Sequence, residues 1–333
     1  MKISASIYSD KNRGLEQTIN DLVAHQVDML HVDCNDDPKV FEDIAQIRKW
    51  CSIPIDLHII SETPEVYFDL LRKTPVEYVT FQYEQLPKGF EMPSDISGEK
   101  GLAIITPTDV DVFSMFENFD FLLLMATIPG QSGGVFAKEN FSKIRQFKKM
   151  YPLKKVHVDG GVNGEVSFLL RNMGVRASVS GSFLFKAPSV GQALLDLTKR
   201  DIESTFKVVD FMVAREECPI LKLSDLDLKA ALQSIEDGKF GFTIIEDNNE
   251  FKGIISNADI RRALLRNFDK LPIIDAVELL NENPITIDES ATVNDMLQLV
   301  KQFAFPIMYL PVVDNNGKIS GCITFLDLVK GEV

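Results

Sequence analysis

The sequence predicts an α/β protein in which a (β/α)8 TIM barrel is followed by a smaller module of two repeats. Apolar runs typical of buried strands alternate with amphipathic stretches as far as about residue 200. No GxGxxG follows any of these strands, which weakens the competing prediction of a doubly wound open sheet. Beyond residue 204, two segments share one internal layout, the mark of a tandem repeat. The 333 residues, 45% of them hydrophobic, are enough for two domains, which we place at 1–203 and 204–333.

The barrel is expected to contain eight strands, each followed by a helical segment. The strands are predicted at 2–7, 29–34, 53–59, 77–82, 101–105, 121–127, 154–160 and 177–182. The stretches LEQTINDLVAHQ and EVSFLLRNMG are the clearest examples of the helices between them. Eight strands within about 200 residues indicate a barrel at the small end of its size range.

Charge and cysteine content restrict the partners and the compartment. The net charge of −14, without a cluster of Lys and Arg, excludes nucleic acid and anionic membranes as main partners. The longest apolar runs, such as 121–128, are far too short to span a bilayer. Four scattered cysteines without a CxxC pair, and an N-terminus without a secretory apolar segment, predict a reduced, cytoplasmic chain. We further expect a homo-oligomer.

The stretch LHVDCND, residues 30–36, places polar side chains inside an otherwise apolar strand. Side chains at i and i+2 of a strand share a face, so His31 and Asp33 are expected to point into the barrel mouth. The strand at 53–59 ends in DLHI and adds His58, and the strand at 154–160 ends in VDG and adds Asp159. Because the C-terminal ends of barrel strands meet at one rim, these four side chains are expected to lie together.

Two imidazoles and two carboxylates at one rim predict a site for one divalent metal ion, such as Zn²⁺, Fe²⁺ or Mn²⁺. The alternative for a single buried His is a hydrogen-bonded core residue, and an Asp before Gly-Gly is usually part of a turn. Four such residues at matched positions favour the metal site. His157 lacks a comparable pattern, and we interpret it as a packing or supporting residue.

Glycine-rich loops after three of the later strands predict a phosphate site. They are PGQSGGVF (129–136), DGGV (159–162) and SGS (180–182), the last followed by a helix start. Glycine lets backbone N–H groups approach an anion, and the last loops of such barrels commonly bind phosphate. Turn geometry alone can explain any one of them, but the three together favour a phosphorylated substrate, and such a cradle needs no basic side chain. The candidate residues are Gly130, Gly133, Gly134, Gly160, Gly161, Gly181 and Ser182.

Residues 1–200 resemble the ribulose-phosphate 3-epimerases in the ordered motifs ISASI, HVD, DLH, GLAI, LMATIPG, VDGGV and VSGS. The resemblance implies that His31, Asp33, His58 and Asp159 bind the metal, that Asp33 and Asp159 also act as acid and base on opposite faces of the substrate, and that Ser6 contacts the substrate. The implied reaction is isomerisation in carbohydrate metabolism. Ribulose 5-phosphate, xylulose 5-phosphate or a related ketose phosphate would be epimerised at C3 through an enediolate.

Several positions depart from the family pattern. Asn35 replaces a Met and no FVPN loop follows, Gln82 replaces a His, and PGQSGG replaces PGFGGQ. The substrate pocket is therefore altered more than the metal site, and a ketose phosphate other than ribulose 5-phosphate remains open. A barrel that has lost turnover and acts as a ligand sensor or scaffold is the alternative function. The DxKxxD motif of the orotidine-monophosphate decarboxylase group is not matched by residues 33–36, DCND, so decarboxylation is disfavoured.

The two C-terminal repeats resemble a pair of CBS modules. Gly253 precedes Ser256 by three residues and Asp259 by six, and Gly321 stands in the same relation to Thr324 and Asp327. In CBS modules such a Ser/Thr-x-x-Asp motif holds a ribose. The resemblance implies an adenine nucleotide or a nucleotide sugar, which would regulate the epimerase. The alternative is that each motif only caps a helix, and its duplication favours binding.

Overall fold

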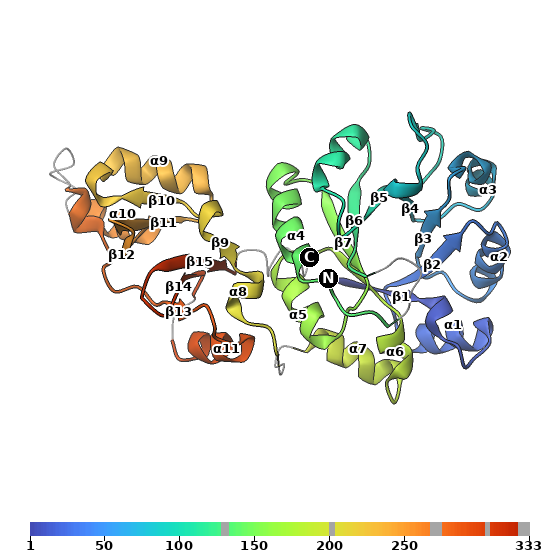
Figure 1. Ribbon diagram of the computed structural model, residues 1–333. Coiled ribbons are helices and arrows are strands. Elements are labelled where there is room, and N and C mark those ends of the chain that lie inside the picture. The colour runs from blue at the N-terminus through green and yellow to red at the C-terminus, as the bar shows by residue number, and fades with distance from the viewer. Residues whose placement is uncertain (128–132, 200–203, 267–274, 304–306, 326–333) are drawn as a thin grey trace. The chain divides into compact units, whose positions relative to one another are not determined.

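The computed structural model describes residues 1–127, 133–199, 204–266, 275–303 and 307–325. One compact unit includes Met1–Ile202 and the other includes Glu203–Leu326. Figure 1 shows the ribbon of both units, and each is described by itself below. Among the residues described, no helix combines the length and apolar character needed to cross a membrane.

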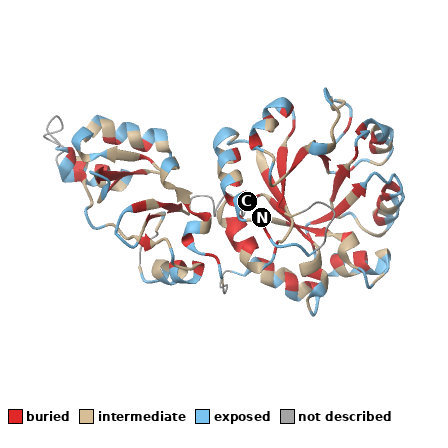
Figure 2. Ribbon diagram, in the orientation of Figure 1, coloured by how far each residue is buried: buried red, intermediate tan, exposed pale blue. Residues whose placement is uncertain are grey.

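The first unit is a closed barrel of eight parallel strands in sequence order, as predicted. The strands are β1 (Lys2–Ser6), β2 (Met29–Asn35), β3 (Ile55–Ile60), β4 (Tyr78–Gln82), β5 (Glu99–Ile105), β6 (Phe121–Met125), β7 (Lys155–Asp159) and β8 (Ala177–Ser180). Pairing of β1 with both β2 and β8 closes the barrel. Figure 2 shows these strands as almost continuously buried, because helices and the barrel interior cover both of their faces.

Amphipathic helices surround the strands. They are α1 (Leu15–Ala24), α2 (Val40–Trp50), α3 (Phe68–Lys73), α4 (Glu139–Met150), α5 (Gly164–Asn172), α6 (Ser182–Lys186) and α7 (Val190–Thr198), with 3-10 segments η1 (Ile7–Ser9), η2 (Pro64–Tyr67), η3 (Tyr83–Gln85) and η4 (Val110–Phe116). In α1, Thr18, Ile19 and Leu22 are buried while most other positions are exposed or partly exposed. Their three- and four-residue spacing places one stripe of the helix against the strands.

The expectation of a helical segment after every strand is wrong for β4. Only the single 3-10 turn η3 follows this strand before β5 begins. The intervening residues include Pro87 and Pro93, which lack the amide hydrogen a helix needs. They also include Gly89 and Gly98, both with positive φ, at +76° and +84°. After β5 the helical segment is the 3-10 helix η4 rather than an α-helix.

The second unit contains the predicted duplication. The first repeat consists of β10 (Ile220–Lys222), η6 (Leu223–Asp225), α9 (Leu228–Gly238), β11 (Phe242–Asp247), β12 (Glu250–Ser256) and α10 (Asn257–Arg266). The second consists of β13 (Ile287–Asp288), α11 (Val293–Lys301), β14 (Tyr309–Val313) and β15 (Ile319–Thr324). In both, the first strand pairs parallel to the second and the second antiparallel to the third. The expected final helix of the second repeat falls on 326–333, outside the described residues.

The segment that enters each repeat pairs with the hairpin of the other repeat. The first entry segment contains α8 (Val208–Phe211), β9 (Val213–Ala214) and η5 (Arg215–Glu217), and β9 pairs with β15. The second contains η8 (Ala276–Leu279) and is followed by Asn281, which bridges to Ile254 of β12.

This exchange explains the equivalent glycines of the two repeats. A Cβ on Gly253 would lie 2.2 Å from the carbonyl oxygen of Asn281, and a Cβ on Gly321 would lie 2.1 Å from that of Val213. The two glycines are therefore required by close backbone packing between the repeats.

Candidate active site

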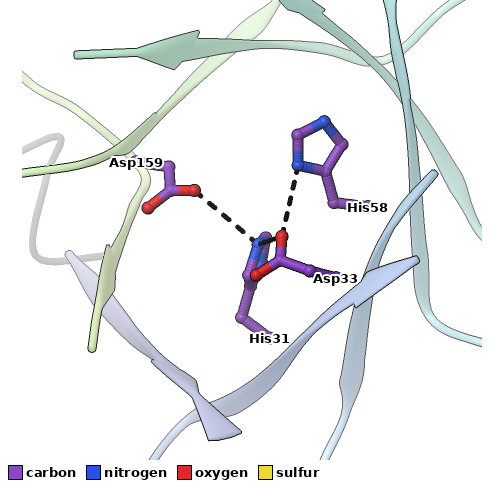
Figure 3. A group of neighbouring side chains, drawn as sticks. All are labelled: His31, Asp33, His58 and Asp159. Atoms are coloured by element: carbon purple, nitrogen blue, oxygen red, sulfur yellow. Dashed lines mark hydrogen bonds and ion pairs between the residues drawn. The ribbon is translucent and has the colours of Figure 1, made fainter. Parts of the chain in front are cut away.

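Four ionisable side chains converge near the C-terminal ends of three barrel strands. β2 supplies His31 and Asp33, β3 supplies His58, and β7 supplies Asp159. One ligand atom of each residue lies within 4.8 Å of the ligand atoms of the others. Figure 3 shows the four side chains gathered at the centre of the barrel. The structure thus brings together all four residues that the sequence placed at one rim.

His31 lies at the centre of this cluster. Its Nε2 is 3.2 Å from Oδ1 of Asp33 and 3.8 Å from Oδ2 of Asp159. The Nδ1 of His58 lies 3.6 Å from the same Asp33 oxygen. Both imidazoles are fully buried, whereas the side chains of Asp33 and Asp159 are 21% and 18% exposed. The two carboxylates are therefore the members of the cluster that a ligand above them can reach.

A further acid, Asp56, orients His31 by binding the ring nitrogen that does not face Asp33 and Asp159. Its Oδ2 lies 2.8 Å from Nδ1 of His31 and accepts a hydrogen bond from the Ser4 hydroxyl at 2.9 Å. A carboxylate that binds one imidazole nitrogen leaves the other directed at the cluster. Asp56 was not predicted as a site residue, although it lies two residues before His58 and so shares its strand face, as His31 and Asp33 do.

The charges of the cluster depend on one another. Burial alone would lower the pKa of His31, but the negative charges of Asp56 and Asp33 raise it well above its usual value. Burial would raise the pKa of Asp33, but the charge and hydrogen bond of His31 lower it. Burial raises the pKa of Asp159 to about 6, against the opposing charge of His31. The three carboxylates therefore favour positive charge at the position of His31.

The donor set fits a divalent metal ion. The Nε2 of His58 is hydrogen-bonded to Gln82 at 3.0 Å, but its buried Nδ1 has no hydrogen-bond partner among the residues that the structure describes. A buried polar atom without a partner costs free energy, and coordination of a cation would satisfy it. Two imidazoles with two carboxylates suit Zn²⁺, Fe²⁺ or Mn²⁺, and the cation would supply the positive charge that the carboxylates favour.

A cavity of about 630 Å³ opens over Asp33 and Asp159. Asn35, which replaces a Met of the resembled family, also lines it. The predicted substrate and phosphate residues in its wall are Ser6, Gly133, Gly134, Gly160, Gly161, Gly181 and Ser182. Gly130 lies outside the described residues. The cavity therefore joins the ionisable cluster to the glycine-rich loops.

Loop packing explains some of these glycines. A Cβ on Gly160 would lie 2.3 Å from Oγ1 of Thr127, and one on Gly181 would lie 2.2 Å from Oγ of Ser9. Gly160 also has a φ of +107°, which disfavours other residues. At these two positions the close approach of neighbouring loops already requires glycine, as the turn interpretation expects.

Gly133 has a different environment. A Cβ built there would lie 3.6 Å from Nζ of Lys186 and 3.7 Å from Oγ of Ser182. Lys186 and Lys11 both line the cavity, although a glycine-rich cradle was not expected to need basic side chains. The sequence contained a signal for Lys186, because it follows Ser182 by four residues and so shares its face of α6.

In the first Ser-x-x-Asp motif of the module, the serine and the aspartate form hydrogen bonds with each other. The Ser256 amide donates to Oδ2 of Asp259 at 2.9 Å, and the Asp259 amide donates to Oγ of Ser256 at 3.2 Å. Arg262 donates to the other oxygen of Asp259. This is the capping geometry of the alternative interpretation. In the second motif, Thr324 ends β15 and Asp327 lies outside the described residues.

Comparison with known proteins shows similarity in both parts of the chain. The sequence matches the ribulose-phosphate 3 epimerase family over residues 2–185 and the CBS domain over residues 276–332. The ribulose-phosphate 3-epimerase of Schizosaccharomyces pombe is 28% identical over 210 residues, which cover 59% of this chain and 92% of that protein. The ribulose-phosphate 3-epimerase of Bacillus subtilis is 26% identical over 200 residues, which cover 56% of this chain and 92% of that protein.

Among solved structures, CBSX2 in complex with AMP is similar with 26% sequence identity and a TM-score of 0.32, over 38% of this chain and 96% of that one. The epimerase match covers more than half of the sequence. The matched residues, 2–185, include all eight strands of the closed barrel. The chain therefore belongs to the ribulose-phosphate 3-epimerase family and carries a CBS domain in its C-terminal part.

Proposed function

We propose that the barrel inverts the configuration at C3 of a ketose phosphate. The observation that carries this proposal is the pair of partly exposed carboxylates, Asp33 and Asp159, which border one cavity above two buried imidazoles. In the barrel order, β8 and β1 separate the strands that supply them. Two carboxylates on different strands can approach a bound carbon from two sides, as inversion requires.

Asp33 and Asp159 are the proposed proton carriers. Inversion next to a ketone requires removal of the C3 proton from one face and return of a proton to the other. Either epimer can enter the reversible reaction, so each carboxylate would act as base in one direction and as acid in the other. His31 lies beside both carboxylates and is itself oriented by Asp56.

One divalent ion, Zn²⁺, Fe²⁺ or Mn²⁺, would be held by His31, Asp33, His58 and Asp159. When bound, it would stabilise the negative charge that develops on the substrate oxygens as the C3 proton leaves. The buried Nδ1 of His58, for which the described part of the chain offers no hydrogen-bond partner, supports this assignment.

The substrate phosphate would bind between Gly133, Ser182 and Lys186, with Ser6 contacting the sugar portion. This assignment is supported by the position of Lys186 Nζ beside Gly133 and by the shared cavity that reaches Asp33. A lysine ammonium provides a point charge suited to phosphate. Ribulose 5-phosphate and xylulose 5-phosphate are the first candidates, and Asn35 in the cavity wall makes a related, more polar ketose phosphate the next.

The test is solvent exchange at C3. Metal-loaded protein is incubated in deuterium oxide with a panel of ketose phosphates, and incorporation at C3 and formation of the epimer are followed by NMR. We expect both with at least one pentulose or hexulose phosphate, and neither with the unphosphorylated sugars. Protein that holds its metal but exchanges no ketose phosphate would contradict the proposal and favour the sensor or scaffold function.

We further propose that residues 204–333 form a CBS pair that binds an adenine nucleotide or a nucleotide sugar, separate from an epimerase domain at 1–203. The CBS match and the duplicated strand pattern support this proposal. Asp259 would accept hydrogen bonds from the ribose, with Ser256 beside it. Regulation of the epimerase further requires that the ligand bind two arrangements of the protein with different affinity.

A further inference from the structure

A chain of hydrogen bonds, buried where it begins, leads away from His58 through its Nε2. The Nε2 of His58 lies 3.0 Å from Oε1 of Gln82, at the end of the neighbouring strand β4. His58 is fully buried and Gln82 is 3% exposed, so water does not compete for this contact. The identity of the proton donor therefore depends on the partners of Gln82.

Those partners fix the direction of the bond. The Nε2 of Gln82 donates to Oε2 of Glu84 and lies 3.4 Å from the carbonyl oxygen of Ala103. A carboxylate and a carbonyl can only accept, so the NH₂ group of Gln82 must face them and its oxygen must face His58. That oxygen can only accept, so Nε2 of His58 carries the hydrogen. In a neutral imidazole, Nδ1 then keeps its lone pair.

Glu84 is itself anchored by the segment after β5. Its Oε1 accepts a hydrogen bond from the amide of Ile105 at 3.1 Å and another from the hydroxyl of Thr108. These bonds hold the carboxylate toward Gln82 although Glu84 is largely exposed. His58 thus donates to Gln82, and Gln82 donates to Glu84, which also accepts hydrogen bonds from Ile105 and Thr108 after β5.

We propose that Gln82 and Glu84 are a positioning pair that holds His58 in its Nε2–H tautomer and so presents Nδ1 to the metal. This inference rests on the proposed metal site. His31 is held in the reverse sense, because Asp56 binds its Nδ1 and leaves Nε2 in the cluster. Gln82 stands where the resembled family has a His, and an amide cannot ionise.

Imidazole ¹⁵N NMR of the metal-free, full-length protein tests the tautomer directly. The chain has four histidines, so the spectrum can be assigned with single substitutions. We expect Nε2–H for His58 in the wild type. Gln82→Leu removes the acceptor, and Glu84→Gln lets the amide of Gln82 reverse. Both variants should show a mixture of tautomers. A wild-type His58 that is protonated on Nδ1, or variants that keep the wild-type tautomer, would overturn the inference.

Metal affinity is the second measurement, by chelator competition with Zn²⁺ or Mn²⁺. Both variants should bind about 10- to 100-fold more weakly, the usual effect of removing a partner that orients a ligand. Gln46→Leu, at an exposed position of α2, is the matched control and should bind as the wild type does. Variants with wild-type affinity would contradict the proposal. A wild type that binds no metal would instead contradict the proposed function, while the NMR result would still decide the role of the pair.

Discussion

The barrel mouth and the start of helix α10 both gather polar side chains, but they satisfy them differently. In the mouth, no described residue hydrogen-bonds to the buried Nδ1 of His58, and Asp33 and Asp159 border a cavity. At α10, Ser256 and Asp259 form reciprocal hydrogen bonds at 2.9 and 3.2 Å. The first arrangement leaves atoms available to a ligand, whereas the second uses much of its bonding capacity within the chain.

A second helix of the module shows how much the Ser/Thr-x-x-Asp pattern means by itself. At the start of α11, the Thr292 amide donates to Oδ2 of Asp295 at 2.9 Å, and the Asp295 amide donates to Oγ1 of Thr292 at 3.2 Å. These distances equal those of Ser256 and Asp259, although no ligand motif was predicted there. The pattern therefore indicates a helix cap, and a ligand role must be established by binding.

The largest expected effect follows from replacing the proposed proton carriers. Asp33→Asn and Asp159→Asn should each lower turnover by about 10²- to 10⁴-fold, because each removes one group that transfers a proton. Steady-state epimerisation and C3 exchange measure the loss. One-face exchange can survive in one of the two variants.

Metal content must be measured on the same two preparations. A variant that has lost its metal does not test proton transfer, so only metal-loaded variants count. Near-normal epimerisation in both loaded variants would require a mechanism without these two carriers.

Removal of a proposed metal ligand is expected to have the next largest effect. Wild-type protein should hold about one divalent ion per chain, and His58→Ala should lose it, because one of four donors is gone. Elemental analysis gives the metal content and circular dichroism tests the fold. His25→Ala, at an exposed position, should keep the metal. A wild type that contains no metal and takes up none on addition would contradict the site.

Lys186→Ala should have a smaller effect that depends on the phosphate. We expect about a tenfold higher KM for the sugar phosphate, equivalent to about 1.4 kcal/mol of binding, with little change in kcat. Inhibition by inorganic phosphate should weaken in parallel. Lys39→Ala, at an exposed position before α2, is the control. An unchanged KM would remove Lys186 from the proposed phosphate site.

Local sequence patterns predicted the barrel and the cluster because both depend on strand periodicity. Parallel barrel strands are buried on both faces, so they read as apolar runs, and all eight were found. The i, i+2 spacing placed His31 and Asp33 on one face. The missing helix after β4 was overlooked, although Pro87 and Pro93 signalled it.

Contacts made through side-chain reach were not predicted. Gln82 was noted only as a departure from a family pattern, yet its amide binds His58 on one side and Glu84 on the other. Lys186 lies more than fifty residues from Gly133 in sequence, and only the folded loops bring them together. Such contacts depend on how neighbouring strands and loops are aligned, which short motifs do not contain.

The smallest expected effects concern the module, where two variants can distinguish a helix-capping role of Asp259 from a ligand-binding role. Asp259→Ala and Asp295→Ala each remove the acidic partner of a cap and should each lower stability by about 1 kcal/mol. If Asp259 also binds ribose, an adenine nucleotide or nucleotide sugar at a hundredfold excess over Kd should stabilise the wild type by about 2.7 kcal/mol. We expect this shift to persist in Asp295→Ala and to disappear in Asp259→Ala, with the metal content of the barrel unchanged in both. A thermal-shift panel measures it. Wild-type protein that shows no shift up to millimolar ligand would leave Ser256 and Asp259 with the capping role alone, and the module would then be interpreted as a dimerisation element.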